Sequence, residues 1–484
     1  MGSVLIAGGG PVGLTMANEL ARFGNAVRIV DTAAARTDKS KALVLWPRTL
    51  ELLAHGGYVE PFLKAGNIAH GAQLSDGTKV VASVTMDGID TPYPYALMIA
   101  QSETERVLEE TLAGRGVTVE RNTTMESFAE KSTGIEAVLR RADGSTETAQ
   151  ADWLLGCDGA HSVTRHALGF SFEGSTQDSD WYLADIHVTG LEPTDRLHIF
   201  WHRDGILAFF PITPGRWRVI ADLGPATGSG HHPDPTLEEI QAMIAHRGTP
   251  GIRVKDPIWL AAFRINERKV KDYSRGRVFL AGDAAHIHSP AGGQGMNTGM
   301  QDAFNLSWKL NLVMAGLCKP SLLDTYSSER SAVGDMVLRN AGRMTEAAIA
   351  RNPVIQTVRN AMVSFALSFP QIGHIMADTL SELNIAYPDS PLSVAGKPAP
   401  HGIKPGHRWP EPLPADTSRS RFIAVGTGAA ILAAKFPTLV EAAPSSERAD
   451  TRDLVLVRPD GYVGYAGAAG DTDGAEAYLK DLAV

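Results

Sequence analysis

The residues best placed to do chemistry lie in one stretch, Arg277–Leu310. It begins with a short apolar run, Val278–Ala281, which predicts a buried strand. Gly282 and Asp283 follow, so a carboxylate stands at the carboxyl end of the strand, where open α/β sheets bind ligands. The loop Gly292–Gly295 then precedes an amphipathic helix; its glycines let backbone N–H groups approach a ligand, and a helix amino end carries positive potential. The stretch predicts a site for a polar, partly anionic cofactor.

The amino terminus predicts a second part of such a site. Val4–Ala7 predicts a buried strand, Pro11–Phe23 a helix, and Val27–Val30 a strand that ends at Asp31. A Gly-x-Gly-x-x-Gly pattern lies between the first strand and the helix, formed by Gly8, Gly10 and Gly13. In this setting the three glycines allow a tight turn, close approach to a pyrophosphate, and packing of helix on strand. With Asp31 available to ribose hydroxyls, the unit predicts a dinucleotide site.

A third glycine-plus-acid turn, Gly156–Gly159, follows the predicted strand Trp153–Leu155. Its carboxylate, Asp158, suits either a cofactor contact or the cap of a turn, and Arg165 suits either a cofactor contact or a structural anchor. Three nearby histidines favour hydrogen-bonded loop positions over acid–base catalysis: His161, His286 and His288. No metal site is expected from the last two.

Composition narrows the function classes. The chain has 484 residues, a formal charge of −9, 44% apolar residues and two cysteines. Such a chain is long enough for two to four domains, and it lacks the basic face that nucleic-acid binding requires. The cysteine count predicts no disulfide framework. The longest apolar region, Ala361–Leu380, is broken by Pro370 and predicts a packed helix rather than a membrane span. With no signal peptide at the start, we expect a cytoplasmic protein, monomer or homodimer.

Taken together, residues 1–330 resemble the single-component (class A) FAD-dependent aromatic monooxygenases, which include aromatic polyketide hydroxylases, rifampicin monooxygenases and phenol hydroxylases. The resemblance implies that Asp283 binds the ribityl chain of FAD and that Pro290–Asn297 cradles the flavin ring. The residues it places around the flavin as catalytic are Pro290, Gly293, Gly295, Met296 and Asn297. Its cofactor-binding residues are Gly8, Gly10, Pro11, Val12, Gly13, Asp31, Lys41, Arg48, Gln101, Asp158, Gly282, Asp283, Gly293, Gly295, Met296 and Asn297.

Two positions depart from the family pattern. The family usually has Ser-Arg-Ala ahead of its Pro-Arg-Thr-Leu-Glu segment, and this chain has Ser40-Lys41-Ala42. Lys41 keeps the positive charge but lacks the planar fork of arginine. Asp31 stands where many relatives have glutamate, and it offers the same chemistry on a shorter side chain.

The order of predicted elements indicates an α/β protein with several units. We expect a Rossmann-type FAD-binding domain of the glutathione-reductase-like kind from residues 1–70, 100–175 and 270–335. Residues 71–99 and 176–269 predict a mostly antiparallel β-sheet domain for substrate. Residues 336–395 predict a helical connection. Residues 396–484 resemble the thioredoxin-like domain of phenol and polyketide hydroxylases, here without cysteine and hence without thiol chemistry.

By resemblance, FAD reduced by NADPH or NADH reacts with O2 to form a C4a-hydroperoxide, which inserts one oxygen atom into an electron-rich phenolic or polyketide-like ring. Backbone N–H groups around Gly293–Asn297 stabilise negative charge on the flavin, and Pro290 helps to exclude water. Four aromatic residues, Trp201, Phe209, Phe210 and Trp217, either line the substrate cavity or pack in the core. No catalytic base is identified.

Other functions fit the same residues. A Baeyer–Villiger oxygenase, a ring-opening oxygenase and a catalytically silent flavoprotein that binds a hydrophobic metabolite would each keep the flavin motifs. A flavin halogenase is disfavoured because the chain has no Trp-x-Trp-x-Ile-Pro segment.

Overall fold

The computed structural model describes residues 2–77, 79–226, 232–349, 362, 370–397, 402–412, 418–443 and 453–484. Much of the helix expected over Ala361–Leu380, and parts of the expected 336–395 connection and of the chain after 396, lie outside these residues. The second half of that helix is described as α10 (Pro370–Leu380). Among the described helices, none combines the length and apolarity needed to cross a membrane.

A six-stranded sheet forms the centre of the first half of the fold. Its order is β18 (Ser274–Arg275), β19 (Val278–Leu280), β12 (Trp153–Gly156), β1 (Ser3–Ala7), β2 (Ala26–Val30) and β8 (Val119–Glu120). All neighbours are parallel except β18 and β19. The short apolar runs predicted from the sequence are buried here, as expected for parallel strands covered on both faces. The carboxyl ends of β1, β12 and β19 therefore meet at one edge of this sheet.

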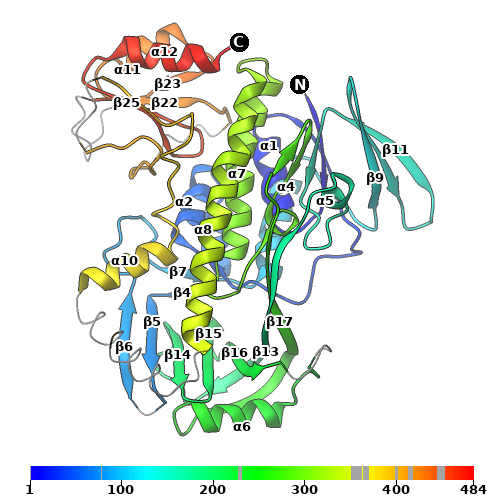
Figure 1. Cartoon of the computed structure of the whole chain (residues 1–484), viewed down its shortest axis with the longest axis vertical. Coiled ribbons are helices and arrows are strands. Elements are labelled where there is room, and N and C mark those ends of the chain that lie inside the picture. Colours follow the sequence, from blue (N-terminus) through cyan, green and yellow to red (C-terminus); the bar gives the residue numbers. More distant parts are fainter. Residues whose placement is uncertain are drawn as a thin grey trace.

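The helices around this sheet are α1 (Pro11–Arg22), α2 (Pro47–His55), α3 (Glu60–Ala65), α4 (Gln101–Ala113), α5 (Val163–Ala167), α7 (Gly295–Met314) and α8 (Asp324–Ile349). Of these, α1, α5 and α8 contact its strands. α1 contacts both α4 and α7, and α7 packs along α8. Figure 1 shows α7 and α8 running side by side through the middle of the molecule, between the carboxyl-terminal domain and the large sheet.

An eight-stranded sheet forms the second half. Its order is β20 (His286–Ile287), β17 (Arg253–Lys269), β13 (Glu173–Thr189), β16 (Arg216–Pro225), β15 (Gly205–Thr213), β14 (Leu197–His202), β5 (Gly71–Ser75) and β6 (Val80–Thr85). Every pair is antiparallel except β14 with β5. Helix α6 (Leu237–Arg247) lies across its outer side (Figure 1). Because β20 pairs with β17, the loop after Asp283 is hydrogen-bonded to this sheet.

Smaller sheets complete the fold. One contains β3 (Val44–Leu45), β7 (Ala96–Met98) and β4 (Asn67–Ala69), and another contains β9 (Thr124–Lys131), β10 (Gly134–Arg140) and β11 (Thr146–Ala151). The carboxyl-terminal sheet runs β21 (Val394–Ala395), β25 (Val463–Gly467), β24 (Leu454–Val457), β22 (Phe422–Val425) and β23 (Val440–Ala442), with α11 (Ala429–Lys435) and α12 (Thr472–Leu482) packed on it. Phe422 and Tyr478 share a core with Trp308 of α7, which fixes this domain to the long helix.

Candidate cofactor and substrate site

A long cleft lies where the carboxyl ends of the parallel strands face the large sheet. The expected cofactor residues that line it are Gly10, Pro11, Val12, Asp31, Lys41, Gln101, Asp283, Gly293, Gly295 and Met296, and Pro290 lines it as well. The structure thus gathers three distant segments in one groove. The other expected residues, namely Gly8, Gly13, Arg48, Asp158, Gly282 and Asn297, are not part of the cleft lining.

The amino-terminal turn has the form that a pyrophosphate requires. Gly8 has a φ of +107°, and its N–H donates to the carbonyl of Val30 at 2.8 Å. A Cβ on Gly13 would collide with the Gly8 carbonyl, so this glycine is needed for helix–strand packing. A Cβ on Gly10 would meet no atom within 4 Å, so the space in front of that residue is open to a ligand. The turn therefore fits the dinucleotide phosphate that its sequence predicts.

Asp31 holds this turn and faces the cleft. Its carboxylate accepts from the Gly9 N–H at 2.5 Å and from the Ala33 N–H at 2.7 Å. Arg121, which the sequence did not indicate, lies 3.8 Å from the same carboxylate and lines the cleft. Arg121 comes directly after β8. It lies near Asp31 because β8 pairs with β2, the strand that Asp31 follows.

Gln101 and Glu105 form the wall of the cleft beyond Asp31. The Gln101 side chain accepts from the Ala42 N–H at 3.2 Å and donates to Glu105 at 2.9 Å. Burial raises the pKa of the Glu105 carboxyl, and the Gln101 hydrogen bond partly offsets this effect. Glu105 stands four residues after Gln101, and this Gln-x-x-x-Glu spacing is the one local signal in the sequence that could indicate it.

Asp283 is exposed to the other end of the cleft. Loss of solvent around the Asp283 carboxyl raises its pKa, and the positive charges of His286 and Lys41 lower it in part. Behind it, the buried Asp302 accepts from the Gly282 N–H at 3.0 Å, from Arg330 Nε at 2.6 Å, and contacts His286 Nε2 at 2.8 Å. Asp302 thereby fixes the turn that presents Asp283, a supporting role the sequence did not reveal.

The glycine loop is tied to β3 by Asn297. The buried Asn297 amide donates to the Val44 carbonyl at 2.9 Å and accepts from the Trp46 N–H at 2.9 Å. The Trp46 indole in turn donates to the Gly292 carbonyl at 2.9 Å. The side chain of Asn297 therefore shapes the loop from behind, while Gly293, Gly295 and Met296 form its cleft surface.

Arg218 joins the large sheet to the cleft. Its guanidinium makes a bidentate pair with Asp185, at 2.7 and 2.9 Å, and donates to the carbonyls of Ser40 and Lys41. Both charged side chains are buried. A paired guanidinium can satisfy several acceptors at once, so Arg218 holds the Lys41 segment over the cleft. Nothing in its local sequence marks it.

Two expected cofactor contacts are corrected by the structure. Arg48 is buried away from the cleft, where it donates to Glu51 at 2.9 Å and to the Asp460 carbonyl at 2.9 Å. The Asp158 carboxylate accepts from Ser162 Oγ at 2.5 Å and from the N–H and hydroxyl of Thr164, both at 2.9 Å, and so bonds to the N-cap and first turn of α5. Both groups are already occupied by protein donors or acceptors.

Arg165 is a structural anchor in this structure. Its guanidinium donates to the carbonyls of Ala284 at 3.1 Å and Ala160 at 2.8 Å, and it lies over the ring of Phe172. It therefore links the turn after β12 to the turn after β19. The third glycine-plus-acid turn thus supports the site from outside the cleft.

An apolar cavity opens from the end of the cleft at the glycine loop, Gly292–Gly295. Residues that line both are Val44, Met98, Phe210, Ile220, Ser289, Pro290 and Gly293. The cavity lies between the large sheet and α10, and its lining is almost wholly apolar. An apolar molecule bound there would contact the glycine loop at Gly292 and Gly293.

The four aromatic candidates divide between the cavity and the core. Trp201 and Phe210 line the cavity. Phe209 and Trp217 are 0% and 2% exposed and pack under α6, so their assignment to the substrate is corrected. Successive side chains of a strand point to opposite faces, which is why neighbours 209 and 210 separate.

The buried Glu382 should make stability depend on pH. It contacts Gln301 Nε2 at 2.5 Å near the start of α7, and burial raises its pKa to about 8, against 4.5 when unfolded. The folded state thus binds more protons at Glu382 in this window, so the contribution of Glu382 to stability is fully present below pH 4.5 and is lost as the pH rises to about 8. In urea titrations between these pH values, the unfolding free energy of Glu382→Gln should fall by about 1.4 kcal/mol less per pH unit than that of the wild type. The exposed Glu238→Gln should change nothing; equal pH profiles of Glu382→Gln and the wild type would contradict the prediction.

Comparisons with known proteins agree with this geometry. A family model described as an FAD binding domain matches residues 1–341. The chain is 33% identical to a 6-methylpretetramide 4-monooxygenase of Streptomyces rimosus, over 99% of this chain and 93% of that protein. It is 33% identical to a rifampicin monooxygenase of Streptomyces venezuelae, over 80% of each chain. The structure of an anhydrotetracycline hydroxylase from Streptomyces rimosus matches with a TM-score of 0.81 and 29% identity, covering 99% of both chains. The chain therefore belongs to the class A FAD-dependent aromatic monooxygenases.

Proposed function

We propose that this enzyme uses NAD(P)H and O2 to insert one oxygen atom into a hydrophobic, multi-ring phenol or polyketide-like substrate. The observation that supports this most is the junction at Pro290 and Gly293, where the polar cleft meets the apolar cavity. A substrate in the cavity would lie against the loop expected to hold the flavin ring. Relatives named for 6-methylpretetramide and rifampicin support a large aromatic substrate.

The residues present fit FAD. Gly10 leaves room for the pyrophosphate, Asp31 offers oxygens to ribose hydroxyls, and Asp283 offers oxygens to the ribityl chain. When bound, reduced FAD activates O2 for oxygen transfer. Backbone N–H groups of the Gly293–Met296 loop, at the amino end of α7, provide positive potential for the electron-rich ring edge. Pro290 and the apolar cavity wall restrict water at the reacting end of the cleft.

The substrate should bind in its neutral form. Among the described residues that line the cavity, none has a charged side chain. Several of their polar groups already bond within the protein: Trp46 Nε1 with Gly292, Trp181 Nε1 with Ser179, and Ser289 with Thr345, at 2.8 to 2.9 Å. An ionised phenol would lose its hydration here without a partner. We therefore propose recognition by shape and apolar contact.

Rapid-mixing kinetics would test this function. The FAD-loaded enzyme is reduced with NADPH or NADH, then mixed with O2 and neutral multi-ring phenols, with a carboxylated phenol as the charged comparison. We expect substrate-dependent reoxidation and a product heavier by one oxygen for neutral compounds only. Product structure separates hydroxylation from Baeyer–Villiger or ring-opening chemistry. NAD(P)H oxidation without any oxygenated product, or no reduction at all, would contradict the proposal and favour a silent flavoprotein.

Adjacent residues on β15 provide a matched pair for the cavity. Phe210→Ala removes a wall of both cavity and cleft and should weaken binding of a multi-ring phenol about tenfold, with a small loss of stability. Phe209→Ala leaves a cavity in the core under α6 and should cost about 3 to 5 kcal/mol of unfolding free energy. The affinity of the folded enzyme for the substrate should change little. Substrate titration and urea denaturation of both variants would check this; the reverse pattern would contradict it.

For the carboxyl-terminal region we propose a thioredoxin-like domain with a packing role. Its mixed five-stranded sheet, with α11 and α12, supports this assignment. Residues 396–484 contain no cysteine, so thiol exchange is impossible there.

A further inference from the structure

A cluster of metal-ligating side chains lies on the large sheet, outside the cleft and cavity. It consists of His202, Asp204 and His246, and one ligand atom from each lies within 4.8 Å of the others. His202 ends β14, Asp204 lies in the turn before β15, and His246 is in the last turn of α6. Because 42 residues separate Asp204 from His246, no local pattern in the sequence indicates the cluster.

The ligand atoms are close to metal-binding geometry. Asp204 Oδ2 lies 2.7 Å from His246 Nε2 and 3.5 Å from His202 Nδ1. Two ligands about 2.1 Å from a zinc ion are separated by roughly 3 to 3.5 Å. His202 Nδ1 accepts a hydrogen bond from the Asp204 N–H at 3.2 Å, and a metal ion would displace this bond to use the same lone pair. Small rotations of the half-exposed Asp204 and His246 side chains would complete the arrangement.

The electrostatic setting has one favourable and two opposing elements. The carboxyl end of α6, where His246 stands, carries negative potential that favours a cation. Arg203 opposes it, with its Nε 3.7 Å from the Asp204 carboxylate, but this side chain is 78% exposed and can turn into solvent. Arg247 also opposes it, because its positive charge acts on His202, although its guanidinium donates to the carbonyls of Ile206 and Asp222.

We propose that His202, Asp204 and His246 bind one divalent transition-metal ion, with Zn²⁺ as the best-matched species. Two imidazoles and one carboxylate select such ions over Mg²⁺ and Ca²⁺, which prefer oxygen ligands, and the exposed side leaves positions for water. The ion joins the β14–β15 turn to α6. Since Ile206 of the same hairpin lines the substrate cavity, binding stiffens one wall of that cavity.

Calorimetric titration of the chelator-treated, FAD-loaded enzyme with ZnCl2 tests the site. We expect one equivalent bound with a Kd of roughly 1 to 10 µM, no binding of Mg²⁺, and a higher unfolding temperature with Zn²⁺. His246→Ala and Asp204→Asn should each weaken binding at least about tenfold and abolish the thermal shift. These positions are exposed, so both variants should fold, which circular dichroism checks.

The control variant is His70→Ala, which removes an exposed histidine 3.8 Å from Asp87 on the same domain. It should bind Zn²⁺ as the wild type does. Two results would overturn the proposal: no saturable Zn²⁺ binding below about 100 µM, or saturable binding that His246→Ala and Asp204→Asn leave unchanged.

Discussion

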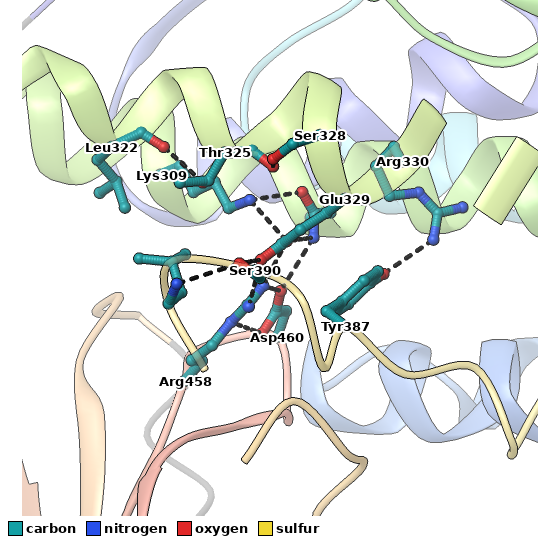
Figure 2. A network of polar contacts seen from close by, with 12 residues as sticks. Lys309, Leu322, Thr325, Ser328, Glu329, Arg330, Tyr387, Ser390, Arg458 and Asp460 are labelled. Carbon is teal, nitrogen blue, oxygen red and sulfur yellow. Dashed lines mark hydrogen bonds and ion pairs between the residues drawn. The ribbon is translucent and has the colours of Figure 1, made fainter. Parts of the chain in front are cut away.

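Replacing Arg458 by methionine is expected to cost about 3 to 5 kcal/mol of unfolding free energy, because it leaves buried carboxylates without their main partner. Arg458 makes a bidentate pair with Glu329 of α8, at 2.7 and 2.9 Å, and also contacts Asp460 at 2.5 Å. Lys309 of α7 donates to the same Glu329 at 2.8 Å (Figure 2). None of these four side chains is exposed by more than a few per cent.

The pKa values in this cluster show how strongly its members depend on one another. Burial raises the pKa of Glu329, but Arg458 and Lys309 outweigh it and hold the pKa below its usual range. Burial lowers the pKa of Lys309 to about 8, so Lys309 is a weak substitute for the lost guanidinium. Because α7 begins at the glycine loop, loosening this contact should also raise the Kd for FAD.

Urea denaturation and FAD titration of Arg458→Met would measure both effects. Arg421→Met is the matched control, since Arg421 lies in the same domain and faces Glu441 at 3.9 Å near the surface, where a pair contributes at most about 1 kcal/mol. Adding Glu329→Gln to Arg458→Met should restore part of the stability, because it removes the excess negative charge and leaves Lys309 with Asp460 in the cluster. Equal stability of the two arginine variants would contradict the prediction.

Gly10→Ala is expected to give a folded protein that has lost most of its FAD affinity. A Cβ at this position meets no protein atom within 4 Å, so folding is unaffected, but the methyl group enters the space that the pyrophosphate requires. A loss of about 100-fold or more in affinity corresponds to about 3 kcal/mol, the scale of one lost set of charge-assisted contacts. Fluorescence titration of the FAD-free protein with FAD measures this loss.

Gly13→Ala provides the contrast. Its Cβ would strike the Gly8 carbonyl, so the helix must shift from the strand and stability must fall as well as affinity. Thermal unfolding of both FAD-free variants separates the two roles. If Gly10→Ala bound FAD like the wild type, the phosphate cradle would lie elsewhere.

The sequence by itself was sufficient to predict the turns that depend on short-range geometry. Gly8–Gly13 and Gly282-Asp283 could be predicted because a strand, a tight turn and a helix start are each encoded within a few residues. The apolar runs of β1 and β19 were equally clear, since parallel strands are buried on both faces. The family was identifiable from these segments for the same reason.

Tertiary structure decided the residues whose partners are far away in the chain. Asp302 with Arg330, Arg218 with the Ser40 and Lys41 carbonyls, and Arg121 beside Asp31 carry no local signal, because the strand order and domain contacts create their pairings. Tertiary structure also decided the roles of Arg48 and Asp158. Their side chains could bind a cofactor, but both form hydrogen bonds within the protein instead. Local periodicity specifies which face a side chain takes, as for Phe209 and Phe210, but only the packed domains determine which face is core and which is cavity.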